Sequence, residues 1–194
     1  MNKIGEIVAS TSTEFTAECY ELHALPALGS LVKVTAPSVE IFGIVCQSGT
    51  AGIEPGRHPV ARGKDETSEE AVYQSSPQLM KLLRSEFQVL VVGHRIEGKI
   101  YQYLPSIPAH IHAFVQVCSQ DEIKQFSQSF DFLNIMLNNR LQIPTEELVA
   151  AGLREMSKAQ TDPYAFLIAA GKSLTVIFSG DYQRLKTILA RLKQ

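Results

Sequence analysis

The segment PALGSLVKVTAPSVEIFGIVCQ, residues 26–47, decides the expected fold of this protein. It predicts two short strands, over 31–36 and 39–47, because Pro37-Ser38 between them is typical of a turn. The second strand contains Gly43. A glycine inside a strand often marks a bend or a bulge, which a sheet needs in order to close on itself. We therefore expect a small, strongly curved β-sheet.

Similar strand patterns lie on both sides of this pair. Four more strands are expected, over 4–10, 13–22, 87–95 and 99–104. The last two are joined by Glu97-Gly98, which is typical of a hairpin turn. Several short strands with interior glycines and tight turns favour a small barrel. We place the end of the barrel near Pro105.

A long irregular stretch, residues 49–70, interrupts the strands. A loop of this length is either functional or mobile. Its basic residues, Arg57, His58 and Arg62, precede an acidic run. The simpler interpretation is a solvated loop, and the more specific interpretation is a loop that docks a partner. A short helix is expected after this loop, over 77–86.

The chain becomes helical after the barrel. A strand-like stretch over 111–118 comes first, and Ser119-Gln120-Asp121-Glu122 is then a capping box, which begins a helix. Further helices are expected over 130–138, from Pro144, from Asp162-Pro163 and after Gly180. The last of them has apolar residues at i, i+3, i+4 and i+7, the pattern of a helix with one buried face.

These patterns predict an α+β protein with two parts. Residues 1–105 form an N-terminal small closed β-barrel, which carries the 49–70 loop and the short helix, and residues 106–194 form a C-terminal helical bundle of about five helices.

Composition restricts the function classes. The net charge of −2 provides no global basic field for nucleic acid. We see neither an N-terminal signal pattern nor an apolar run near the roughly 20 residues of a membrane helix.

Cys19, Cys46 and Cys118 are far apart in the sequence, so we expect buried thiols rather than a disulfide framework, in agreement with a reducing cytoplasm.

The triplet Gly171-Lys172-Ser173 resembles the end of a phosphate-binding P-loop. A complete P-loop requires a glycine five residues before Gly171, and Phe166 stands there instead. Asp162-Pro163 also predicts a helix that has already begun before the triplet. The triplet is therefore expected inside a helix, where its backbone N–H groups are committed to the helix itself.

Three histidines are candidates for a metal ligand or a catalytic group: His94, His110 and His112. His110 and His112 would share one face of a strand, but Cys118 is about 27 Å along that strand from His110, too far for a single tetrahedral site. We expect both histidines to be satisfied by other hydrogen bonds. His94, at the end of a buried strand, is expected to be structural. No cofactor, metal or catalytic residue is predicted.

The final helix carries a second group of basic residues, Arg184, Lys186 and Arg191. Basic residues near a helix C-terminus complement its dipole, which is the plainer interpretation. The more specific interpretation is that these residues contact an acidic partner or nucleic acid.

Two stretches resemble a known family, the HAS-barrel. They are IGEIVASTSTEF, residues 4–15, and the opening segment, residues 26–47. The resemblance is carried by Gly5, Ser12, Thr13, Phe15, Gly29 and Gly43. HAS-barrels lie at the N-terminus of HerA-like hexameric ATPases and of ATP synthase subunits. The resemblance covers about the first half of the chain and implies side-by-side assembly and partner docking. The ATPase activity does not carry over, because we find no complete Walker A motif.

The sequence therefore predicts a non-enzymatic assembly or adaptor module, which associates with itself or with a protein partner. The candidate partner-binding residues are Arg57, His58, Arg62, Arg184, Lys186 and Arg191. The alternative is an accessory factor of DNA processing, acting with a HerA-like ATPase or binding nucleic acid weakly. A third class, a small-molecule enzyme, would need a pocket between barrel and bundle with a perturbed titratable group.

Overall fold

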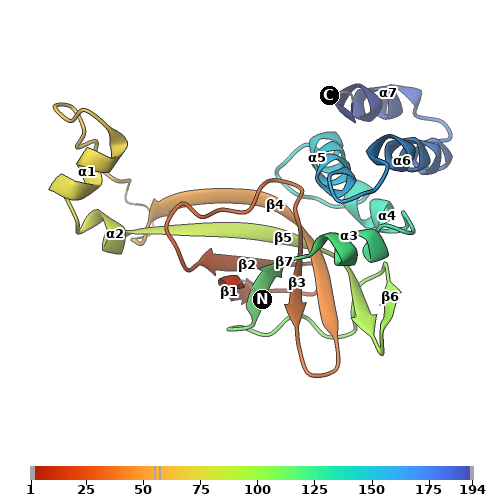
Figure 1. The fold of residues 1–194 in the computed structure, drawn as a ribbon, viewed down its shortest axis with the longest axis horizontal. Helices are drawn as coiled ribbons and strands as arrows, with labels where there is room; N and C mark the ends of the chain where they lie inside the picture. Colours follow the sequence, from red (N-terminus) through yellow and green to blue (C-terminus); the bar gives the residue numbers. More distant parts are fainter. Residues whose placement is uncertain (1–2, 55, 57, 193–194) are drawn as a thin grey trace.

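The computed structural model describes residues 3–54, 56 and 58–192. Its strands form one antiparallel sheet in the order β2-β1-β7-β3-β4-β5-β6, and an additional pairing of β2 with β5 closes the sheet into a barrel. The strands are β1 (Lys3–Ser10), β2 (Glu14–Cys19), β3 (Leu31–Thr35), β4 (Glu40–Gly52), β5 (Leu83–Ile96), β6 (Lys99–Tyr101) and β7 (Phe114–Val117). The barrel and the helices that follow it confirm the predicted α+β class (Figure 1).

The sequence predicts that the barrel ends near Pro105, but the structure contains one more barrel strand after this residue. β7 lies between β1 and β3 and pairs with both, with Val115 opposite Gly5 on one side and opposite Val34 on the other. The boundary expected at residue 105 was therefore wrong for the sheet, because the last barrel strand comes from the 106–194 half of the chain. A strand that fills a gap between two distant strands has no local signal beyond its own apolar pattern.

Gly43 behaves as the sequence predicted. The pairing of β4 with β5 shifts its register between Phe42 and Gly43, which is where a bulge bends the strand. A Cβ atom at this position would lie 2.3 Å from Cγ1 of Val89. A side chain therefore does not fit, and the glycine allows the two strands to curve closely together.

The interior of the barrel is filled by side chains from every strand of the sheet except β6, which lies outside the closure. The buried residues of this core are Ile7, Phe15, Ala17, Cys19, Val32, Val34, Ile41, Val45, Phe87, Val89, Val91, Ala109 and Val115. Side chains alternate between the two faces of a strand, so the other face of β4 and β5 presents a second apolar set to the outside of the barrel.

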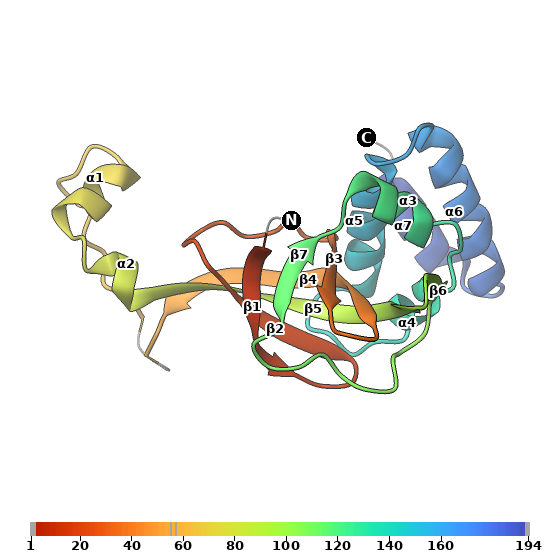
Figure 2. The same cartoon turned by 60° about the horizontal axis from the view of Figure 1, so that its bottom comes forward.

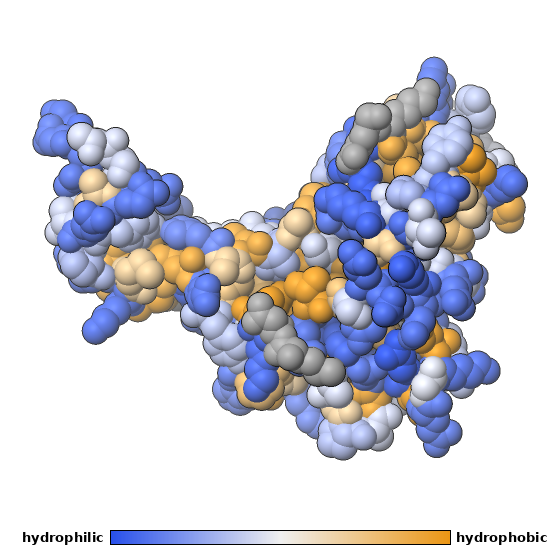
Figure 3. Space-filling model, in the orientation of Figure 1, coloured by the Kyte–Doolittle hydropathy of each residue, from blue (hydrophilic) through white to orange (hydrophobic). Residues whose placement is uncertain are grey.

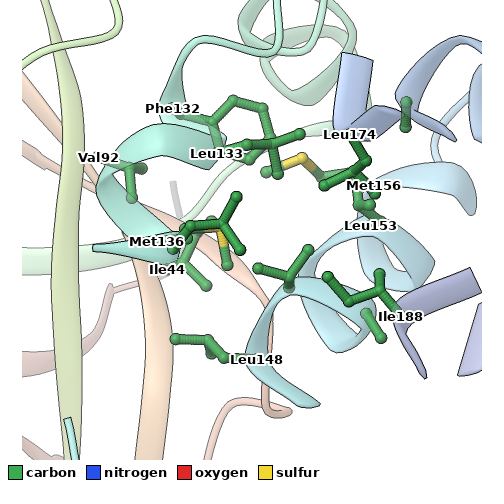
Figure 4. Close-up of a cluster of buried hydrophobic side chains, with 14 of the residues drawn as sticks. Ile44, Val92, Phe132, Leu133, Met136, Leu148, Leu153, Met156, Leu174 and Ile188 are labelled. Carbon is green, nitrogen blue, oxygen red and sulfur yellow. The ribbon is translucent and has the colours of Figure 1, made fainter. Parts of the chain in front are cut away.

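Helices cover that outer face. They are α3 (Gln120–Phe126), α4 (Phe132–Leu137), α5 (Thr145–Ser157), α6 (Pro163–Ile177) and α7 (Tyr182–Leu192). Ile44 of β4 and Val92 of β5 belong to one buried cluster with Met136 of α4 and Leu148 of α5 (Figure 4). The helices after residue 119 were expected close to these positions. Their local signals are confirmed: Ser119 and Glu122 form the capping box, and the Asp162 side chain caps α6.

The far ends of β4 and β5 leave the barrel and form a two-stranded arm. Beyond Glu86, the last residue of β5 that pairs with β2, they pair only with each other, from Thr50 opposite Ser85 to Gly52 opposite Leu83. Two short helices lie at the end of the arm, α1 (Glu69–Ser75) and α2 (Leu79–Leu82). The arm extends from one side of the barrel and the helical bundle packs on the other (Figures 1 and 2).

The arm corrects two sequence expectations. The 49–70 loop is shorter than predicted, because β4 continues to Gly52 and α1 begins at Glu69. The helix expected over 77–86 is confined to α2, because Leu83 and the residues after it pair with β4. In both cases pairing with a distant strand outweighs the local pattern.

A buried group of charges joins the barrel to α3. Lys33 of β3 is 4 % exposed, and its Nζ lies 2.5 Å from Oε1 of Glu122 and 3.2 Å from Oε1 of Glu40. Nη1 of Arg95 lies 2.6 Å from the other carboxylate oxygen of Glu40. Burial lowers the pKa of Lys33, but the hydrogen bonds that its ammonium donates to Glu122 and Glu40 outweigh this effect and hold that pKa above its usual value.

Gly29→Ala is expected to destabilise the protein by about 3 kcal/mol, measured as the free energy of chemical unfolding. Gly29 has φ +87°, and a Cβ atom there would lie 2.4 Å from the backbone carbon of Ala151 in α5. The substitution would therefore push the β2–β3 loop away from α5. Gly49→Ala is the control, because its Cβ would meet nothing within 4 Å. Equal stabilities for the two variants would contradict this account.

Glu122→Gln is expected to lower the free energy of unfolding by about 2 kcal/mol at pH 7, with a smaller difference from the wild type in acid. Burial raises the pKa of Glu122, but hydrogen bonds from Lys33 and from the backbone of Ser119 outweigh it and hold the pKa below its ordinary 4.5. This stabilisation is complete above pH 4.5 and is lost as pH falls through the lower, folded pKa.

Urea unfolding from pH 3 to pH 7 measures this difference. Asp121→Asn on the same helix is the control, because the Asp121 side chain is exposed and its oxygen lies 3.9 Å from Nζ of Lys124. A constant difference between wild type and Glu122→Gln across this pH range would contradict the assignment.

Candidate docking site on the arm

The base of the arm is held to the barrel by a polar cluster. Nε2 of His23, in the β2–β3 loop, lies 2.7 Å from the Tyr73 hydroxyl of α1. The backbone N–H of His23 donates to Oγ of Ser85, and this hydroxyl lies 2.7 Å from Oγ1 of Thr50. His23 has φ 66°, a conformation that side chains rarely adopt. The loop is therefore shaped to reach α1 and to fix its place relative to the barrel.

A pocket of about 130 Å³ lies at the end of the arm. It is lined by Gly52, Ile53, Glu54, His58, Pro59, Val60, Arg62, Leu79, Leu82 and Leu83. Apolar side chains around it are exposed: Val60 by 74 % and Met80 by 54 %. Figure 3 shows apolar residues gathered over α2 and the neighbouring strands of the arm. Such a group of exposed apolar side chains with polar neighbours is typical of a protein interaction site.

The basic residues predicted in the loop fall at this pocket. His58 and Arg62 line it, whereas Arg57 lies outside the residues that the structure describes. The acidic residues that follow along the chain, Asp65, Glu66, Glu69 and Glu70, are exposed. The pKa of Glu70 is lowered by hydrogen bonds from its own backbone N–H and from Ser68 at the start of α1. The arm therefore presents apolar, basic and acidic groups within one short segment.

The basic residues of α7 lie far from this pocket, at the other side of the molecule (Figure 1). Nε of Arg184 lies 2.6 Å from Oε1 of Glu146 in α5, and Arg191 forms an ion pair with Glu147. Arg184 holds the pKa of Glu146 below its usual range. Lys186 is exposed. The two arginines of the predicted set hold α7 against α5, which reduces the positive charge that α7 offers to an anionic partner.

The triplet that resembles a P-loop lies inside α6, as predicted. Lys172 is exposed, and a Cβ atom at Gly171 would lie 3.5 Å from Cδ2 of Leu189 in α7. Oγ1 of Thr175 donates a hydrogen bond to the carbonyl oxygen of Gly171, so this carbonyl is engaged within the helix. The glycine lies where α6 and α7 are in contact.

His110 and His112, the candidate metal ligands, do not come together on one face of a strand. Nδ1 of His112 lies 2.5 Å from Oε1 of Glu6, and β7 begins only at Phe114, so His110 and His112 do not share a strand face. Cys118 is buried, and burial raises the pKa of its thiol. Within residues 3–54, 56 and 58–192, no group of three or more His, Cys, Asp or Glu side chains is arranged to hold a metal ion.

His94 is buried in β5 among aromatic rings. Its Nδ1 lies 3.1 Å from the carbonyl oxygen of Tyr103, and its ring stacks on Tyr101 with the centroids 5.3 Å apart. These contacts agree with the structural role expected for it.

A second exposed apolar surface lies on α6, and the sequence patterns had not singled it out. Tyr164 is 75 % exposed, Val176 is 76 % exposed, and Ile168 lies between them on the same side of the helix. Lys172 is the single charged residue of α6. The signal was present in the sequence as a long apolar stretch from 164 to 178, but its exposure depends on which helices pack around it.

No protein-family model matches the sequence, and a search of curated proteins found no match. Among the described residues, the helices are too short or too polar to cross a lipid bilayer.

Mg-ATP is expected to leave the melting temperature of the protein unchanged, because the N–H groups around Lys172 lie within α6 and are not arranged as a phosphate-binding loop. Thermal denaturation with and without millimolar Mg-ATP measures this, and Lys172→Ala is the comparison variant. A melting temperature that rises with Mg-ATP in the wild type, and not in Lys172→Ala, would contradict the helical interpretation of the triplet.

Proposed function

We propose that this protein is a non-enzymatic assembly or adaptor module, in which a HAS-like barrel carries a projecting arm that docks to a protein partner. The observation that supports this most is the end of the arm, where the apolar side chains of Val60 and Met80 are exposed at a pocket with both apolar and charged lining residues. An adaptor needs a surface of this kind on an element that extends beyond its own core.

The construction of the arm supports the same proposal. β4 and β5 are 13 and 14 residues long, more than twice the common strand length of about 5–6. An isolated two-stranded ribbon is marginally stable in water. This ribbon is the continuation of two buried barrel strands, and the contact between His23 and Tyr73 holds α1 to the β2–β3 loop of the barrel. The arm is therefore an ordered extension of the barrel strands, and the apolar side chains at its end are exposed to solvent.

The barrel itself supports a scaffolding role. Phe15, Phe87 and Val115 fill its interior together with the rest of the inner core. A barrel packed with side chains serves as a rigid support. Its resemblance to HAS-barrels agrees with this, because the resemblance implies assembly and partner docking.

The double variant Val60→Asp, Met80→Asp is expected to abolish partner capture by the arm without unfolding the protein. Both side chains are exposed, so the substitutions remove apolar contact area from a surface and not from a core. Size-exclusion chromatography with light scattering measures self-association. Affinity capture from the source cell, followed by mass spectrometry, identifies other partners. Ile107→Asp, at an exposed apolar residue outside the arm, is the matched control.

The proposal predicts that wild type and the Ile107→Asp control share an oligomer or a captured partner that the arm variant lacks. A strictly monomeric wild type that captures no partner would be inconsistent with an assembly or adaptor function. Capture that the arm variant retains in full would remove the arm from the proposal.

A further inference from the structure

α6 is an unusual helix for its position in the fold. Its sequence is apolar apart from Lys172, Ser173 and Thr175, and helices that are apolar all round are normally buried. It is nevertheless an outer helix, since Phe166, Ala170 and Leu174 pack inward while Tyr164 and Val176 are more than 70 % exposed. The exposed face of α6 is therefore a surface that another protein surface would bury favourably.

The two exposed apolar surfaces lie at opposite ends of the molecule. The arm with α1 and α2 occupies one end of the longest axis, and α6 occupies the other (Figure 1). Figure 3 shows apolar residues in both places. Two different complementary surfaces at opposite ends of one chain produce head-to-tail association, which closes into a ring or continues as a filament.

We propose that the end of the arm of one copy docks on the exposed face of α6 in the next copy. This inference rests on the proposed assembly function and specifies its partner as a second copy of this chain. In the complex, the Tyr164 ring of one copy enters the arm pocket of its neighbour.

The size and lining of the pocket suit an aromatic ring. A pocket of about 130 Å³ is close to the volume of about 150 Å³ that holds a benzene molecule in an apolar protein cavity. Ile53, Val60 and Leu82 provide apolar walls. Arg62, which also lines the pocket, supplies a guanidinium that attracts the face of a tyrosine ring. Tyr164 is 75 % exposed in the isolated chain, so its ring is available.

Exposed charges of opposite sign are available at the two ends of the molecule. Asp65, Glu66 and Glu69 are exposed on the arm and follow the basic Arg62 and Lys64 along the chain. The helical end offers Lys172 and Lys186, both exposed and neither in an ion pair among the residues that the structure describes. Complementary charge favours the arm-to-helix contact. A symmetric contact between two α6 helices would gain no such complementarity, because Lys172 is the one charge of that helix.

Two complementary variants test this contact. The arm variant is Val60→Asp, Met80→Asp, and the helix variant is Tyr164→Asp, Val176→Asp. All four side chains are exposed, and circular dichroism checks that both variants remain folded. Each variant retains one intact half of the contact. Analytical ultracentrifugation of each variant alone and of their equimolar mixture measures the assembly.

The wild type is expected to form rings or longer assemblies, and each variant alone is expected to be monomeric. The mixture is expected to give a 1:1 dimer and nothing larger, because only the helix variant's arm and the arm variant's α6 remain intact. A mixture that stays monomeric would overturn the head-to-tail contact. Assemblies that persist in either variant alone would overturn it as well, while leaving the proposed assembly function in place through another surface.

A second pair of variants covers the case in which a folded helix variant is not obtained. Asp65→Lys, Glu66→Lys on the arm and Lys172→Glu, Lys186→Glu on the helices change only exposed charges. Each is expected to weaken association at least about tenfold, and combining both in one chain is expected to restore it. Failure of the combined variant to recover would count against the contact. A monomeric wild type would also overturn it, and partner capture would then decide the proposed function separately.

Discussion

Two-sided burial of β4 and β5 is the constraint on which the rest of the structure depends. On one face of these strands, Val45 and Val89 fill the barrel, and on the other face, Ile44 and Leu90 belong to the cluster under the helices. Removing either layer would expose a continuous apolar surface to water. The barrel and the helical bundle are therefore parts of one folding unit, and the arm is the continuation of the same two strands beyond both layers.

Polar interactions determine how these layers fit together. Lys33 crosses from the barrel to Glu122 of α3, and this carboxylate also completes the capping box with Ser119. A buried ammonium is tolerated only with charged partners and hydrogen bonds, which restricts α3 to a position that supplies them. Gly29 adds a steric condition, because only a residue without a side chain lets its loop approach the backbone of α5. These contacts fix the position of the helices more narrowly than apolar packing would.

The same architecture leaves two apolar surfaces without cover. The arm extends beyond the barrel at one end, and α6 lies on the outside of the bundle at the other. Helices α5 and α7 pack against each other through apolar contacts and through the ion pairs of Arg184 and Arg191. The outer, solvent-exposed apolar face of the bundle therefore belongs to α6. An elongated molecule with unlike apolar ends is suited to associate in a line or a ring, which is the basis of the proposed assembly.

The sequence by itself determined the features that depend on neighbouring residues: the capping box at Ser119, the start of α6 at Asp162, and the bend at Gly43. Only the tertiary structure decided that β7 lies between β1 and β3 in the barrel, how far β4 and β5 extend, and which partners Lys33 has. Caps and turns are interactions within a few residues, so their residue types reveal them. Strand pairing, buried ion pairs and the exposure of α6 depend on contacts between distant segments, and local patterns do not record which segments meet.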